Sequence, residues 1–379
     1  MEIVRNPFIL TPFVPEEYFC DREKETAQLC KHILNGRNVA LFARRRLGKT
    51  GLIRHCFEQE VIKDNFNTFL VDIYPAESLK EMTSLFAREV FSKAGVMGMK
   101  EKLIKGLKSI KPAISYNELT STYSLSAGFS EIKEPERTLE EILGILDNLK
   151  KPTVIAIDEF QKIRDFKEDN VEAYLRTAFQ KCKNILFIYT GSIGHSMNNI
   201  FKSPDKPFYN SAVMMTIGVI DKKNYREFAA RMFRSRGKDV DEELVDKCYD
   251  YFDGITWYNQ LLMNETFAQT ETGGKLYAKD FDSIYDAIIA QQAFSYQELF
   301  LRFSAKQKQL LLSIAQEDKE GAMVTSQAFL SKNGLGGASS VQTAVTALKK
   351  GNFITENGKK KQITDLIFRD WLIRCPLSL

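Results

Sequence analysis

Short apolar runs alternate with amphipathic stretches through the first half of the chain. Four of the runs predict buried strands, at residues 38–42, 67–74, 153–157 and 185–190. The stretches between them repeat apolar residues at helical spacing and predict helices at residues 51–61, 79–94, 138–149 and 170–182. Apolar strands that alternate with helices are typical of a parallel sheet covered on both faces, so we expect an α/β core.

The pattern changes after about residue 216. Residues 221–300 keep helical periodicity with almost no strand signal, whereas residues 301–379 mix helices with a short hairpin. The segment 95–137 begins with basic, helix-like residues and continues with Ser, Thr and Tyr, which fits a hairpin or a mobile insert. We expect three domains: a core, a helical lid and a winged helix-turn-helix, at 1–216, 217–300 and 301–379.

The first predicted strand runs directly into a phosphate-binding loop. The residues from Ala43 to Thr50 read Ala-Arg-Arg-Arg-Leu-Gly-Lys-Thr, close to the P-loop pattern, and a helix is predicted after them. In such a loop backbone N–H groups hold phosphates, the lysine reaches the outer phosphates and the hydroxyl binds Mg²⁺. Ala43 replaces the first glycine, which is tolerable only if its φ is negative. The predicted nucleotide-binding residues are Ala43, Arg44, Arg45, Arg46, Leu47, Gly48, Lys49, Thr50, Gly51 and Asp158.

A second acidic motif completes this candidate site. Five apolar-rich residues from Thr153 lead into Asp158 and Glu159, the Walker B pattern. Asp158 would share Mg²⁺ with Thr50, and Glu159 would position or deprotonate the attacking water. We therefore expect bound ATP and Mg²⁺, with Glu159, Lys49 and Ser192 as catalytic residues.

Two assignments at this site leave alternatives open. Ser192 and, as second choice, Thr190 lie at the tip of the next predicted strand, where a polar side chain reaches the γ-phosphate or the water; Ser192 is equally well explained as a helix N-cap. The three consecutive arginines Arg44–Arg46 fit contacts with nucleotide, a neighbouring subunit or DNA, and equally a solvated loop face.

Charge and composition narrow the class of protein. The chain has 379 residues, 44% hydrophobic and 27% charged, with a net charge of +4, as in soluble globular proteins. Basic residues outnumber acids in residues 305–379, so this module is the candidate for a polyanion partner. Six scattered cysteines without a CxxC pair predict free thiols. With no signal-peptide pattern and no membrane-spanning run, we expect a cytoplasmic protein.

The C-terminal module has the pattern of a winged helix. A helix capped by Ser339 and extending to Lys350 turns Val341, Ala344, Val345 and Leu348 inward. Residues 353–364 predict a hairpin with an Asn357-Gly358 turn. Its lysines would meet phosphates of double-stranded DNA, although such modules also bind proteins. The predicted DNA-binding residues are Ser340, Gln342, Thr343, Thr346, Lys349, Lys359, Lys360 and Lys361.

Taken together, these residues resemble the archaeal-type ATPase family, which belongs to the AAA+/STAND class of P-loop NTPases and also occurs in Bacteroidetes-like bacteria. The motifs that carry the resemblance are residues 19–25, 43–50, 71–74, 158–161 and 190–192. The resemblance implies an αβα core of AAA+ type, a helical lid and a winged helix, laid out as in origin-recognition ATPases. It also implies ATP as the nucleotide, Arg22 near the nucleotide and a tendency to self-assemble.

The chain departs from the family pattern at two places. The stretch from Pro207 to Ser211 lacks the arginine of the family's frequent Pro-Leu-Tyr-Gly-Arg pattern, and the lid motif Gly254–Tyr258 lacks the usual proline. Arg231, Arg234 and Arg236 are possible substitutes. We expect a slow ATPase that acts as a nucleotide-dependent switch coupled to the winged helix; the alternative is a DNA-binding regulator or protein-interaction adaptor with a mainly structural nucleotide site.

Overall fold

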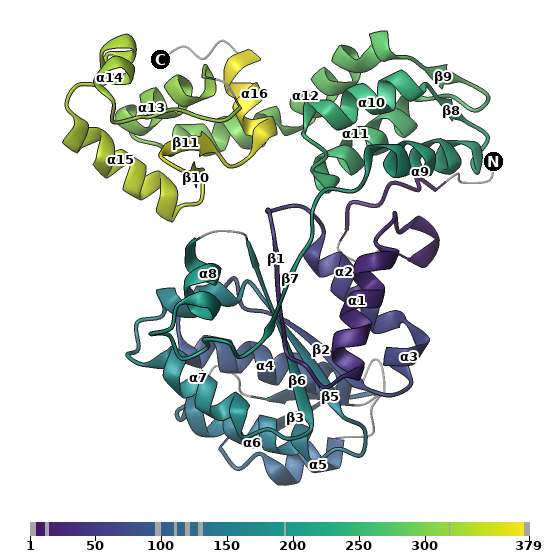
Figure 1. Ribbon diagram of the computed structural model, residues 1–379, viewed down its shortest axis with the longest axis vertical. Coiled ribbons are helices and arrows are strands. Elements are labelled where there is room, and N and C mark those ends of the chain that lie inside the picture. Colours follow the sequence, from purple (N-terminus) through teal and green to yellow (C-terminus); the bar gives the residue numbers. More distant parts are fainter. Residues whose placement is uncertain are drawn as a thin grey trace. The chain divides into compact units, whose positions relative to one another are not determined.

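The chain folds into two compact units, drawn in Figure 1. The computed structural model describes residues 5–11, 15–94, 100–109, 112–117, 122–127, 132–192, 195–317 and 319–374. We call Ile9–Phe228 with Gly254–Tyr258 the sheet unit. The helical unit consists of Met1–Phe8, Ala229–Asp253 and Asn259–Leu379.

A parallel sheet of five strands forms the centre of the sheet unit, in the order β2-β5-β6-β1-β7. Every residue of β1 and β5 is buried, as expected for inner strands of a covered parallel sheet. The predicted α/β fold is confirmed. The strands are β1 (Val39–Ala43), β2 (Asn67–Asp72), β5 (Thr153–Asp158), β6 (Ile185–Ser192) and β7 (Val213–Thr216).

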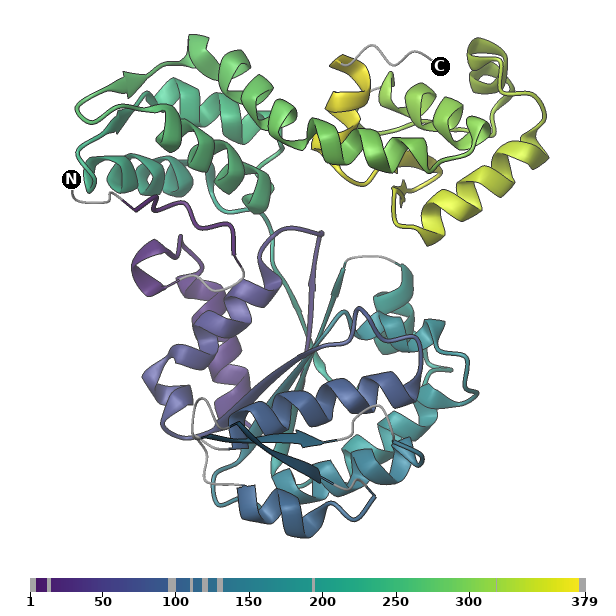
Figure 2. The ribbon, with the colours of Figure 1, turned by 180° about the vertical axis from the view of Figure 1, so that it is seen from behind.

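Helices cover both faces of this sheet. Helix α1 packs against α2 on one side, and α4 packs against α6 on the other (Figures 1 and 2). Helix α6 shows the cause, because its Leu139, Ile142, Leu143 and Leu146 form one buried stripe. The helices are α1 (Glu23–Leu34), α2 (Lys49–Glu58), α3 (Glu60–Lys63), α4 (Leu79–Ala94), α6 (Pro135–Asp147), α7 (Val171–Gln180) and α8 (His195–Lys202), with 3-10 turns η1 (Glu16–Tyr18) and η3 (Phe160–Asp165).

The insert after α4 contains the expected hairpin. Helix α5 (Lys100–Gly106) precedes strands β3 (Pro112–Asn117) and β4 (Thr122–Ala127), which pair antiparallel. The remainder of the 95–137 segment includes residues outside those described.

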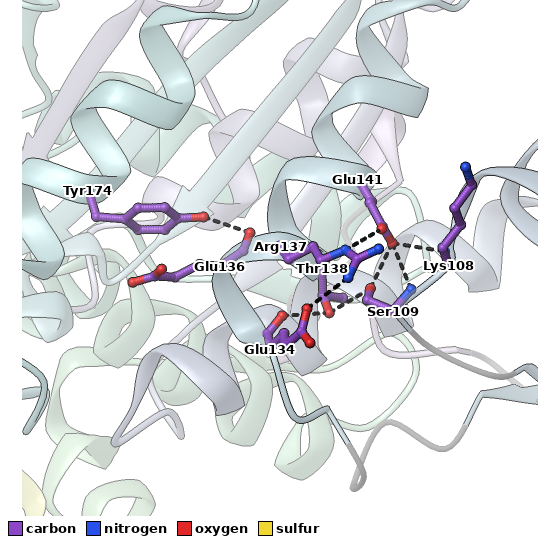
Figure 3. A network of polar contacts seen from close by, with 8 residues as sticks. All are labelled: Lys108, Ser109, Glu134, Glu136, Arg137, Thr138, Glu141 and Tyr174. Carbon is purple, nitrogen blue, oxygen red and sulfur yellow. Dashed lines mark hydrogen bonds and ion pairs between the residues drawn. The ribbon is translucent and has the colours of Figure 1, made fainter.

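A polar network fixes the end of α5 to α6 (Figure 3). The carboxylate of Glu141 accepts hydrogen bonds from the backbone N–H groups of Lys108 at 2.9 Å and Ser109 at 3.0 Å, and from the Ser109 hydroxyl at 2.7 Å. Arg137 donates to the other carboxylate oxygen at 3.2 Å, and Thr138 donates to the Ser109 hydroxyl at 2.8 Å. The half-buried Glu141 carboxylate therefore provides the hydrogen-bond acceptor for the backbone N–H groups that follow α5.

The helical unit contains a helix bundle followed by a winged-helix arrangement. The tiny strands β8 (Asp239–Val240) and β9 (Lys275–Leu276) pair in parallel beside the bundle. The winged-helix part ends in an antiparallel hairpin and a last helix. Helices α9 (Lys222–Arg234) and α11 (Thr256–Gln269) begin in the sheet unit and continue into the bundle. The other elements of the bundle and the winged helix are α10 (Glu242–Tyr251), η4 (Ala278–Asp280), α12 (Phe281–Leu301), α13 (Ala305–Ala315), α14 (Gln327–Asn333), α15 (Ala338–Lys350), β10 (Ile354–Asn357), β11 (Lys360–Ile363) and α16 (Leu366–Arg374).

A buried acid joins these two parts of the helical unit. Asp370, on α16, is 4% exposed and accepts hydrogen bonds from the hydroxyls of Tyr251 at 2.9 Å and Tyr285 at 2.6 Å. The two tyrosine rings pack against each other with centroids 5.1 Å apart. Because buried polar groups are costly without partners, this joint ties α16 to α10 and α12. The division of lid from winged helix at residue 300 stays a prediction.

Several predicted boundaries were wrong for local reasons. Helix α2 begins at Lys49 instead of residue 51, because Gly48 is its N-cap, and it ends at Glu58 because Gln59 is extended. Strand β2 ends at Asp72, whose carboxylate accepts the Tyr74 N–H at 2.9 Å and turns the chain. Strand β7 was missed, since its four residues form a short, half-exposed edge.

Two details of the winged helix were also wrong. The N-cap of α15 is Gly337, and Ser339 lies inside the first turn. Asn357 pairs with Lys360 across the hairpin, so the connecting residues are Gly358 and Lys359. Gly358 supplies the positive φ of 59° that this turn requires.

The described cysteines are free thiols, as expected. They are Cys20, Cys30, Cys56, Cys182 and Cys248, and Cys375 lies outside the described residues. The sulfur atoms of Cys30 and Cys56 are in contact at 3.3 Å. No helix within the described ranges has the length and apolar character needed to cross a membrane.

The Glu141 network makes a pH-dependent prediction. Burial raises the pKa of Glu141, but the hydrogen bonds from Ser109, Lys108 and Arg137 hold it below its ordinary 4.5. Its contribution to stability is therefore complete above pH 4.5 and is lost as the pH falls through the folded-state value. At neutral pH, Glu141→Gln should lower the free energy of unfolding by about 1–3 kcal/mol.

Urea unfolding at neutral pH and below pH 4.5 measures this effect. The difference between wild type and Glu141→Gln should narrow at the lower pH. Glu136→Gln, on an exposed position of the same helix, is the matched control and should change little. A Glu141→Gln difference of equal size at both pH values would contradict the assignment.

Candidate nucleotide site

The phosphate loop lies between the end of β1 and the start of α2. Ala43 is the last residue of β1 and has no positive φ, so its Cβ is tolerated in this loop as the sequence requires. Gly48 adopts φ 89°, a left-handed conformation that favours glycine, and caps α2. Lys49 and Thr50 form the first helical turn, where backbone N–H groups and the helix dipole favour an anion.

Lys49 is held beside two acids. The residue is only 7% exposed. Burial holds the pKa of its ammonium group below the ordinary value, although the carboxylates of Glu159 and Asp158 act in the opposite direction. A buried cation of this kind is stabilised by nearby negative charge, and the phosphates of a nucleotide would add to that charge.

Asp158 is the meeting point of three elements. It ends β5, and its Oδ2 accepts a hydrogen bond of 2.6 Å from the Thr50 hydroxyl at the start of α2. Its Oδ1 accepts from the Thr190 hydroxyl on β6 and from the backbone N–H of Glu159. The structure thus brings together the two predicted metal-binding residues.

The chemistry of this pair fits Mg²⁺. A hydroxyl and a carboxylate are hard oxygen ligands, and here they come within 2.6 Å of each other. Mg²⁺ typically takes one or two protein oxygens and completes its shell with water and phosphate oxygens. Thr50 and Asp158 are therefore the residues that would hold the ion.

The side chain of Glu159 is held by a residue that the sequence had not singled out. Glu159 has a left-handed φ of 57°, and its carboxylate accepts a hydrogen bond from the Gln161 side-chain amide. The next residue, Phe160, is fully buried, and its ring centroid lies 4.6 Å from that of Tyr189. This packing fixes the turn against β6. The Asp-Glu-Phe-Gln order gave the signal, because it places an amide two residues after the acid.

Gly191 leaves room for Gln161. A Cβ at Gly191 would lie 2.3 Å from the Gln161 side-chain oxygen and 2.6 Å from Cγ of Met197. That Gln161 oxygen is buried and has no hydrogen-bond partner among the described residues. A side chain at this position would therefore displace Gln161 or Met197, and glycine lets β6 approach the residue that holds Glu159.

The two candidates at the tip of β6 lie in different places. Thr190 is fully buried and bonds to Asp158. Ser192 is partly exposed and pairs in register with Ala43, where the phosphate loop begins. Their roles toward a nucleotide stay hypotheses.

The structure separates the three loop arginines. Arg44 and Arg45 are exposed, whereas the half-buried Arg46 packs on the rings of Trp257 and Tyr258. Leu47 is buried below the loop, and Gly51 lies one turn into α2 with the Phe19 ring 3.7 Å from the position of a Cβ.

Arg22 and the lid arginines belong to other surroundings. Arg22 is buried and donates to the Gly218 carbonyl and to Glu25, both at 2.7 Å. Arg231, Arg234 and Arg236 belong to the helical unit, so their relation to the loop stays a hypothesis. Asn210, in the stretch that lacks the family's frequent arginine, has a left-handed φ of 51°.

The candidate DNA surface on the winged helix carries its own counter-charges. Ser340, Gln342, Thr343, Thr346 and Lys349 are exposed on α15, and Lys359 is exposed in the turn of the wing. Glu356, however, binds Lys349 and Lys361 at 2.9 Å each, and Lys360 binds Glu320 at 2.8 Å. Both lysines hold the pKa of Glu356 below its ordinary value. The sequence prediction overlooked these acids, although Glu356 lies directly opposite Lys361 in the hairpin.

Comparisons with solved structures agree with this fold. A Walker-type ATPase of Pyrococcus abyssi is 21% identical, with a TM-score of 0.59 over 97% of this chain and 99% of that chain. The Aeropyrum pernix ORC1 protein, solved in complex with DNA, is 14% identical, with a TM-score of 0.57 over 99% and 98% of the two chains. The ADP form of Aeropyrum pernix ORC2 is 14% identical, with a TM-score of 0.52 over 97% of each chain.

Comparisons of sequence identify two family models along the chain. A search of curated proteins gives no significant match. Residues 294–374 match the model described as "Probable winged helix domain". Residues 19–262 match the model described as an ATPase domain predominantly from Archaea, and they include the phosphate loop, Asp158 and Glu159. The chain therefore belongs to the family of ATPase domains found predominantly in Archaea, joined here to a C-terminal winged helix.

Proposed function

We propose that this protein binds and slowly hydrolyses ATP with Mg²⁺, and that nucleotide state controls a winged helix that binds double-stranded DNA. The observation that carries the proposal is the convergence of Lys49, Thr50, Asp158 and Glu159 at one end of the sheet. Each comes from the position that the P-loop and Walker B motifs assign to it.

The triphosphate would be bound mainly by the loop and α2. Backbone N–H groups between Ala43 and Thr50 would hold the phosphates, and the Lys49 ammonium would neutralise the outer ones. Thr50 and Asp158 would release their mutual hydrogen bond to hold the metal. When bound, Mg²⁺ supplies positive charge beside the phosphate oxygens that gain negative charge during transfer.

Hydrolysis would depend on Glu159. Its carboxylate would orient the attacking water or accept its proton, which requires it to turn from Gln161 toward the phosphate. Ser192, beside the loop, and Thr190, on Asp158, are the candidates for sensing the γ-phosphate. The absence of an arginine from residues 207–211 favours slow turnover, because a guanidinium stabilises charge in phosphoryl transfer.

The DNA-binding part of the proposal is supported by the exposed polar face of α15 and the lysines of the wing. Small polar side chains suit a DNA groove, and lysines at the edge suit phosphates. The similar ORC1 structure was solved in complex with DNA. We place the protein in the cytoplasm, with self-assembly as a further possibility that the AAA+ resemblance suggests.

Two observations favour the alternative, a regulator or adaptor whose nucleotide site is mainly structural. Gln161 already binds the carboxylate that would act on water, and Lys360 and Lys361 of the wing are already paired with acids. An adaptor would bind nucleotide without turnover and would use the winged helix to contact a protein.

Phosphate release from ATP tests the catalytic proposal. Lys49→Ala should abolish nucleotide binding, whereas Glu159→Gln should keep binding and lower turnover by about 10²–10⁴-fold, the usual contribution of a positioned base. Binding is followed by the rise in melting temperature with MgATP.

Lys80→Ala, an exposed lysine on α4, is the matched control for charge removal and should behave as wild type. Wild-type phosphate release no greater than that of Lys49→Ala would refute hydrolysis. If MgATP still raised the wild-type melting temperature, the adaptor alternative would stand.

Removal of the wing's counter-charge tests the DNA proposal. Glu356→Gln frees Lys349 and Lys361, so DNA affinity should rise and the dependence of log Kd on log salt should steepen by about 1–2 units. Fluorescence anisotropy with a labelled duplex at several salt concentrations measures both quantities. Glu298→Gln, an exposed acid on α12, is the control. Absence of binding at low salt in all variants would point to a protein partner.

A further inference from the structure

Arg46 is the loop residue most firmly attached to something outside the loop. Its guanidinium carbon lies 4.7 Å from the ring centroids of both Trp257 and Tyr258. The same guanidinium donates a hydrogen bond to the Tyr258 hydroxyl, and the Arg46 carbonyl accepts the backbone N–H of Trp257 at 3.1 Å. Side chain and backbone of one residue therefore hold the same dipeptide.

The backbone of Arg46 is held in an unusual conformation. Its φ is 68°, a left-handed value that a side chain with Cβ rarely adopts, and its neighbours Arg44 and Arg45 are exposed. Such a conformation persists only when surrounding contacts determine it. The contacts with Trp257 and Tyr258 hold both the side chain and the backbone carbonyl of Arg46.

The dipeptide occupies a special position in the chain. Trp257 and Tyr258 lie in the first turn of α11, which begins at Thr256 and continues to Gln269. Tyr258 is the last residue of the sheet unit, and the helical unit resumes at Asn259 within the same helix. The residues that hold Arg46 thus lie directly before one of the points where the chain enters the helical unit.

We propose that Arg46 transmits occupancy of the phosphate loop to α11, and through it to the helical unit that carries the winged helix. The inference rests on the proposed nucleotide binding and assigns Arg46 as its positioning residue. Backbone N–H groups of the loop would bind the phosphates, so bound nucleotide would reset the Arg46 backbone. A ligand shifts a conformational equilibrium only through contacts that differ between the states, and the Arg46 carbonyl and guanidinium are contacts of that kind.

The two tryptophans of the chain provide a direct probe. They are Trp257 and Trp371, and Trp371 packs among Tyr296, Phe300 and Phe368 in the helical unit, where a phenylalanine keeps the ring packing. In Trp371→Phe protein, tryptophan emission therefore comes from Trp257 alone, and Arg46 is one of the groups packed on that ring. We expect saturating MgADP or MgATP to change the intensity or wavelength of Trp257 emission.

The amplitude at saturation, measured for each variant after its own calorimetric titration, separates transmission from affinity. In Arg46→Gly, which accepts the left-handed backbone, most of the amplitude should disappear. Tyr258→Phe keeps the ring but loses the hydroxyl, and should reduce the amplitude partly. Arg54→Ala, at an exposed arginine on α2 outside the predicted nucleotide-binding residues, should retain it. Hydrogen exchange of the α11 segment after Tyr258 should slow on nucleotide binding in wild type and not in Arg46→Gly.

The outcomes are distinct. A full Trp257 signal and full α11 protection in Arg46→Gly would overturn the inference while leaving nucleotide binding intact. So would calorimetric binding to the Trp371→Phe protein without any change in Trp257 emission. If calorimetry detected no nucleotide binding to wild type, the proposed function and this inference would fail together.

Discussion

The sheet unit is organised around the carboxylate of Asp158. This one group at the end of β5 accepts hydrogen bonds from α2, from β6 and from the backbone of the following turn. A buried carboxylate is costly unless its oxygens are satisfied, so the three elements must stay in register for the charge to be tolerated. The same bonds hold the Thr50 hydroxyl beside Asp158, the pair that we propose would hold the metal. The contact that satisfies the buried acid is thus also the one on which the proposed metal binding depends.

The sequence predicted the core well because its signals are local. Fully apolar strands such as β5 and the strand–loop–helix order around Lys49 and Thr50 depend on neighbours in the chain. What it missed depends on residues that meet only in three dimensions. The close approach of Gly191 to Gln161 and Met197 depends on the pairing of β5 with β6.

The same contrast applies to charges and boundaries. A count of lysines in the C-terminal module predicted a basic face, but the pairing of Glu356 with two of them depends on hairpin register. Ser339 was predicted as the N-cap of α15 because serine is common at N-caps. The helix instead begins at Ala338, so its N-cap is Gly337. The aromatic partners of Arg46 are separated from it by more than two hundred residues, so no local pattern could have indicated them.

The buried joint at Asp370 has a mechanical consequence. Two tyrosine hydroxyls from the bundle and one acid from the last helix link the bundle to the winged helix within the helical unit. Because Tyr251 and Tyr285 share one acceptor, movement of either tyrosine away from Asp370 would leave a buried polar atom without its hydrogen bond. The bundle and the winged helix are therefore favoured to move together over moving separately.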